Sequence, residues 1–187
     1  IRAALVSLGW EVIDFRPLLS SFGHWQAILG GNLKSWNEVS AVWVPCFRQR
    51  DFASAHAIAG RLEVPLIFDL LISAYDKQVF EREKFPQNSS KAKELLRWES
   101  QLFQQAHGVI ADSASHADYF VDQFALKSGA AQIVPVGADE EIFSEQPWSD
   151  SVKDGPVEIL FYGSFIGLQG PKIIAKPKNN ITNVISH

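Results

Sequence analysis

The stretch SKAKELLRWESQLFQQAHGVIADS, residues 90–113, places a helix directly before a buried strand. Its first part carries apolar residues on one helical stripe, which is typical of a helix that packs one face against a core. These residues are Ala92, Leu95, Leu96, Leu102, Phe103 and Ala106. The helix is predicted to span 90–106 and to end at His107-Gly108, and GVIADS (108–113) is predicted to be the next strand. A helix followed at once by a strand is typical of α/β folds.

The same alternation continues on both sides of this stretch. Apolar, β-prone runs predict strands at 11–15, 39–47, 64–71, 131–136 and 157–162. Helices are predicted at 1–9, with Gly9 as the C-terminal stop, around 23–29, at 52–62 and at 116–124. Because most of these strands are apolar along their whole length, both of their faces should be covered by helices. The sequence therefore predicts a Rossmann-like, mainly parallel α/β sheet with helices on both faces.

Two helix starts carry predicted N-terminal caps. Asp51 stands directly before the helix at 52–62, where a carboxylate can accept the first free N–H groups. Ser115 and Asp118 resemble a capping box at the start of the helix that follows. Both assignments are local predictions that side-chain hydrogen bonds can check.

The composition narrows the class of protein. The 187 residues carry a net charge of −4, which argues against a basic nucleic-acid surface. No apolar run approaches the ~20 residues that span a bilayer, and no signal-peptide pattern opens the chain. The single cysteine, Cys46, favours the cytoplasm and is interpreted as a small buried hydrophobe. Methionine is absent even at position 1, so the sequence is interpreted as part of a longer chain.

Polar residues follow four of the predicted strands, at the edge where parallel sheets bind ligands. They are Asp69 and Asp76, then Asp112 and Ser113, then Gly137 and Asp139, and finally the glycine turn GSFIGLQG at 163–170. A carboxylate just past a buried strand can act as a general base, accept hydrogen bonds from hydroxyls, or cap a helix. For each carboxylate alone these alternatives remain open, and their shared edge favours a site.

The glycines at the last strand end fit no nucleotide fingerprint. Gly163, Gly167 and Gly170 do not have the G-x-G-x-x-G spacing, and no G-K-[ST] follows. Such a turn can still present backbone N–H groups to a phosphate, or it can be an ordinary tight turn. Neither His116 nor His107 has further ligands at metal spacing, so no metal is expected. His107 is interpreted as a favourable partner of a helix C-terminus.

Four segments together resemble the retaining glycosyltransferases of family 4, which have the GT-B fold, and most closely the bacterial group 1 members. They are PLIFDLLISAYDK, RWESQLFQQAHGVIADSASHADYF, IVPVGADEEIF and VEILFYGSFIGLQG, within residues 39–171. The resemblance implies transfer of a sugar from a nucleotide-sugar donor to the hydroxyl of a glycan or lipid-linked acceptor. It implies two Rossmann-like domains, no cofactor, a role in surface glycan assembly, and peripheral contact with the inner membrane face.

The resemblance also implies roles for single residues. Asp69 and Asp76 become the candidate catalytic carboxylates, and Ser113, Gly137 and Asp139 line the cleft between the domains. In the glycine turn, Gly163, Ser164 and Gly167 match the loop whose backbone contacts the donor diphosphate. Leu71 departs from the family pattern, in which proline is expected at this position.

The expected domains follow from the same match. Residues 1–144 would form the N-terminal, acceptor-side domain, 145–156 a linker, and 157–187 the start of a donor-binding domain that continues in cis. The family's first strand would precede residue 1, so its loss should leave an apolar slot in the sheet and a weakly stable, inactive piece. A non-catalytic α/β module that binds a sugar or nucleotide is the alternative.

Overall fold

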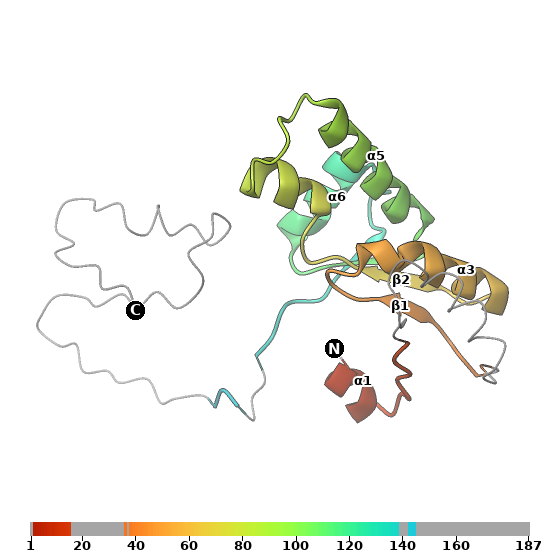
Figure 1. Cartoon of the computed structure of the whole chain (residues 1–187). Coiled ribbons are helices and arrows are strands. Elements are labelled where there is room, and N and C mark those ends of the chain that lie inside the picture. The colour runs from red at the N-terminus through yellow and green to blue at the C-terminus, as the bar shows by residue number, and fades with distance from the viewer. Residues whose placement is uncertain (1, 16–35, 37, 139–141, 145–187) are drawn as a thin grey trace, which may run out of the picture.

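The computed structural model describes residues 2–15, 36, 38–138 and 142–144 (Figure 1). Its elements, in chain order, are α1 (Arg2–Ser7), β1 (Val42–Val44), the 3₁₀ turn η2 (Gln49–Asp51), α3 (Phe52–Leu62), β2 (Leu66–Asp69), α4 (Ala74–Asp76), the π-helical turn η3 (Lys77–Glu81), α5 (Ser90–Gln105), β3 (Gly108–Ala111), α6 (Ala114–Phe124) and β4 (Ala131–Ile133). The predicted linker 145–156 and the segment 157–187 lie outside the described residues.

The four strands form one parallel sheet in the order β1-β2-β3-β4. Val44 pairs with Phe68, Phe68 with Val109, and Ala111 with Ile133. Parallel neighbours need a crossover, and each crossover here contains a helix. The predicted α/β class with a parallel sheet is therefore confirmed.

The helices that connect the strands share one face of this sheet. Right-handed crossovers between strands taken in chain order place every connecting helix on the same side, and Figure 1 shows α3, α5 and α6 there, with α1 on the other side. The opposite face holds the half-buried side chains of Trp43, Ile67 and Ile110. Among the described residues, helices covering both faces are not found, since α1 has no buried residue.

Aromatic rings fill the layer between the sheet and the helices. Phe68 of β2 lies between Phe52 of α3, with ring centroids 5.1 Å apart, and Phe103 of α5, at 5.4 Å. Phe103 in turn contacts Phe120 and Phe124 of α6 at 4.8 and 4.6 Å. This chain of rings joins three helices to the sheet and forms the core of the domain.

Three predictions about the strands are corrected. Residues 11–15 form no strand, although they are apolar enough for one. The other described strands are shorter than predicted: for example, β1 stops before Pro45, which has no N–H to donate. The expected slot is not found between the described strands, because their hydrogen bonding is continuous from β1 to β4.

The predicted caps are also corrected. Asp51 precedes α3 as expected, but its side chain makes no capping bond and instead pairs with Arg48. The N-cap of α6 is Ser113, whose Oγ accepts a hydrogen bond from the His116 N–H, so Ser115 lies inside the helix. Ser113 has extended backbone angles, as an N-cap requires.

Replacing Ser113 by alanine is expected to destabilise the chain by about 1 kcal/mol, because the first turn of α6 loses its side-chain acceptor. Ser115→Ala is the matched control and should change stability by no more than about 0.5 kcal/mol. Urea unfolding followed by circular dichroism measures both. A larger loss for Ser115→Ala than for Ser113→Ala would contradict this assignment of the cap.

Candidate functional site

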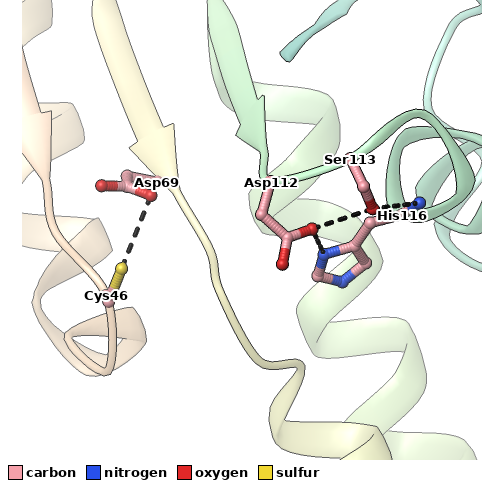
Figure 2. Close-up of polar contacts among 5 residues, drawn as sticks. All are labelled: Cys46, Asp69, Asp112, Ser113 and His116. Atoms are coloured by element: carbon pink, nitrogen blue, oxygen red, sulfur yellow. Dashed lines mark hydrogen bonds and ion pairs between the residues drawn. The ribbon is translucent and has the colours of Figure 1, made fainter. Parts of the chain in front are cut away.

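The carboxyl ends of β1, β2 and β3 bring polar side chains to one edge of the sheet. Cys46 follows β1, Asp69 ends β2, and Asp112 and Ser113 follow β3. Figure 2 shows Asp69 directed toward Cys46, while Asp112 faces His116 on α6. Because neighbouring parallel strands end at the same edge, the fold itself gathers these groups.

Asp69 is buried with one of its oxygens unpaired. Only 5% of the residue is exposed, and its Oδ1 accepts a hydrogen bond from the Cys46 thiol over 3.5 Å. Its Oδ2 is buried and has no hydrogen-bond partner among the described residues. Buried carboxylate oxygens are nearly always hydrogen-bonded, so an unpaired one is a feature that calls for a ligand or a structural reason.

Cys46 differs from its interpretation as a buried hydrophobe. The residue is only half-buried, and its Sγ–H donates to Asp69. Burial raises the pKa of the Cys46 thiol, and the negative charge and hydrogen bond of Asp69 raise it further. The raised pKa favours the protonated thiol, which is a weak hydrogen-bond donor and reacts slowly as a nucleophile.

A second polar group lies at the end of β3 and the start of α6. The Asp112 Oδ1 lies 2.8 Å from the His116 Nδ1, and the Ser113 hydroxyl donates to the same oxygen over 3.1 Å. Burial acts to raise the pKa of Asp112, but the hydrogen bonds from His116 and Ser113 outweigh it and hold that pKa below its ordinary value. The carboxylate thus fixes the orientation of the imidazole ring.

This pair was missed by the sequence interpretation, which found no carboxylate near His116. The signal was present, since Asp112 stands four residues before His116. Substituting His116 by alanine is expected to raise the pKa of Asp112 toward 3.8, because its strongest hydrogen bond is lost. Carboxyl carbon NMR across an acid titration measures this shift. A pKa of Asp112 that does not move in the variant would show that His116 does not hold it.

Asp76 lies on α4 and is hydrogen-bonded to α6. The Tyr119 hydroxyl donates to Asp76 Oδ1. Burial raises the pKa of Asp76, although the hydrogen bond from Tyr119 and the charge of His116 act against this. The same contact raises the pKa of Tyr119, whose burial is the larger cause. Asp76 is therefore grouped with His116 rather than with Asp69, and its catalytic role stays a prediction.

Glu99 is a buried carboxylate close enough to Asp76 and Tyr119 to affect their charges, and the sequence interpretation did not consider it. Glu99 of α5 is 0% exposed and accepts hydrogen bonds from the Ser73 hydroxyl, the Ala74 N–H and the Tyr75 N–H. Burial raises the pKa of Glu99, while those three hydrogen bonds lower it. Glu99 thus holds the start of α4, two residues before Asp76.

The remaining predicted residues are only partly placed. Gly137 is exposed and lies after β4, where a Cβ would meet no atom within 4 Å. Asp139, Gly163, Ser164 and Gly167 lie outside the described residues. His107 directly follows Ala106, the C-cap of α5, and its Nδ1 accepts a hydrogen bond from the Leu66 N–H at the start of β2. Its role as a partner of the helix C-terminus stays a prediction.

No group of three or more His, Cys, Asp or Glu side chains in the described part of the chain could hold a metal ion. No described helix is both long enough and apolar enough to cross a membrane.

The chain matches no family model, no curated protein and no solved structure. Its function must therefore be inferred from its own residues and their geometry.

Proposed function

We propose that this chain contains the acceptor-side domain, residues 1–144, and the start of the donor-binding domain, residues 157–187, of a retaining glycosyltransferase with the GT-B fold, which uses a nucleotide-sugar donor. The observation that carries the proposal is the common edge of Asp69 and Ser113 at the carboxyl ends of adjacent parallel strands. Open α/β sheets bind their ligands beyond these ends. The unpaired, buried oxygen of Asp69 suits a hydroxyl donor, which is the group that a glycosyl acceptor presents.

In this proposal Asp69 binds the reacting acceptor, while Ser113, Gly137 and Asp139 line the cleft. Asp76 acts with the His116–Asp112 pair at the same rim. The proposed donor loop supplies backbone N–H groups to the diphosphate of the nucleotide sugar. Its contacting residues would be Gly163, Ser164 and Gly167.

The proposed sugar transfer needs no cofactor. The acceptor oxygen forms a bond to the anomeric carbon of the donor as the bond from that carbon to the diphosphate oxygen breaks. The diphosphate leaves with the bonding electrons and takes up the proton of the acceptor hydroxyl. Charge develops on the leaving diphosphate, where N–H donors in fixed positions stabilise it.

The test uses the protein encoded by the complete reading frame that contains these residues. Calorimetry against UDP-, GDP- and ADP-sugars finds the donor, and release of the nucleoside diphosphate in the presence of glycan or lipid-linked acceptors measures transfer. Asp69→Asn is expected to lower kcat/KM by about 10²-fold or more if Asp69 contacts the reacting hydroxyl. Sugar or nucleotide binding without any transfer would instead support a non-catalytic binding module.

A further inference from the structure

The turn after β1 lies against the loop after β2. The Cys46 thiol donates to Asp69, the Leu71 backbone makes a further hydrogen bond with Cys46, and the Gln49 side-chain amide donates to the Ile72 carbonyl. In addition, the Nζ of Lys77, at the start of η3, lies 5.6 Å from the centroid of the Phe47 ring. Cys46 and Phe47 are adjacent in the chain, so the turn that carries the exposed Phe47 ring also carries the thiol that contacts the buried Asp69.

Asp69 lacks the hydrogen bonds that a buried carboxylate normally has. In the part of the chain that the structure describes, the one donor to its side chain is a thiol, which is a weak donor, and its second oxygen has none. A ligand hydroxyl would be a stronger donor than the thiol. Asp69 therefore gains hydrogen bonds when a molecule with free hydroxyls displaces Cys46 from it.

Phe47 is the second unusual feature of this turn. Its φ of +65° lies in the left-handed region, which bulky residues rarely adopt, and 57% of the residue is exposed. Such backbone strain is found most often at binding and catalytic sites. The turn therefore holds an aromatic ring in water at the rim that contains Asp69, where burying the ring would be favourable.

We infer that Phe47 and Asp69 form a subsite for a neutral sugar ring, in which the apolar face of the sugar packs on Phe47 and one of its hydroxyls donates to Asp69. The identity of the ligand as the acceptor sugar rests on the proposed function. The sugar hydroxyl takes the place of the Cys46 thiol at the Asp69 Oδ1, so binding moves Cys46 away from the carboxylate. Lys77 keeps the ring in place from η3.

Cys46 provides a readout that needs no enzymatic activity. It is the single cysteine of the 187 residues, and its alkylation by iodoacetamide can be followed by mass spectrometry of the peptide that contains it. The probes are methyl glycosides of glucose, galactose and mannose, added to the protein from the complete reading frame. Binding at Asp69 is expected to change the alkylation rate of Cys46 in a saturable way, which gives an apparent Kd.

Two kinds of control separate binding at this subsite from a nonspecific effect of the glycosides on the alkylation rate of Cys46. The permethylated form of each methyl glycoside keeps the sugar ring but has no hydroxyl to donate, so it should leave the alkylation rate unchanged. Asp69→Asn should weaken the apparent Kd about tenfold or more, because a hydrogen bond to a charged acceptor is lost.

Variants of Phe47 test the ring separately from the strain. Phe47→Gly keeps the left-handed backbone without cost and should weaken binding about three- to tenfold, because the aromatic face is gone. Phe47→Trp should retain the affinity of the natural chain. These variants keep the inference testable if Asp69→Asn unfolds, which circular dichroism would reveal.

The outcomes distinguish this inference from the proposed function. Transfer of sugar by a protein whose Cys46 reactivity no glycoside alters, or equal affinity in Phe47→Gly and the natural chain, would overturn the subsite and leave the glycosyltransferase proposal intact. A saturable change in the alkylation rate with the expected variant pattern, but without transfer from any nucleotide sugar, would support the subsite and overturn the glycosyltransferase proposal.

Discussion

Replacing Phe103 by alanine is expected to destabilise the chain by about 3–5 kcal/mol, which is the range for deleting a buried phenylalanine ring. Phe103 is 0% exposed and contacts rings from the sheet and from α6. Its loss would leave a cavity between the two layers, since rings on both sides would lose their partner. Urea unfolding at equilibrium measures the change.

Two further variants make this result specific. Phe143→Ala removes the same ring from a residue that is 67% exposed, and it should cost no more than about 0.5 kcal/mol. Phe103→Leu keeps most of the volume and should give an intermediate loss, which provides a measurable value if the alanine variant does not fold. Equal effects of alanine at positions 103 and 143 would contradict the described core.

Replacing Glu99 by glutamine is expected to cost about 1–3 kcal/mol, because a buried donor is left unpaired. The glutamine amide nitrogen cannot accept the hydrogen bonds that Ser73, Ala74 and Tyr75 now donate. The start of α4 should loosen, and with it the position of Asp76. Glu94→Gln makes the same change at an exposed site of α5 and is the matched control.

The raised pKa of Glu99 predicts how the loss of stability in Glu99→Gln changes with pH. The pKa of Glu99 is raised above 4.5, so the folded state binds its proton more tightly than the unfolded state. The contribution of Glu99 to the free energy of unfolding therefore falls as the pH rises from 4.5 through the raised pKa. Glu99→Gln lacks this change, so its deficit should be larger at pH 4.5 than at neutral pH. A deficit that grows with rising pH would contradict the raised pKa.

The sequence predicted the order of most described elements because each has a strong local pattern. The apolar stripe of α5 correctly predicted a helix, and the apolar runs of β2 and β3 correctly predicted strands. The bounds of these three elements differ from the prediction by a few residues. The polar edge followed from the parallel sheet, so Asp69 and Ser113 were correctly expected to share it. The role of Ser113 as a cap was missed because Ser115 carries an equally good local signal.

Contacts between distant residues could not be predicted in the same way. Glu99 meets Ser73 across 26 positions, and Cys46 meets Asp69 across 23, so no local spacing connects them. The placement of the connecting helices on one sheet face, among the described residues, was also missed, because apolar strands favour two covered faces whatever the order of the strands. The order β1-β2-β3-β4 decides which face the connecting helices take.

That strand order has a consequence for biosynthesis. Each described strand pairs with the one made just before it, so no strand must wait for a partner from the far end of the chain. We expect the sheet to grow one strand at a time as the polypeptide leaves the ribosome, since short loop closures are fast and domains form from the N-terminal side.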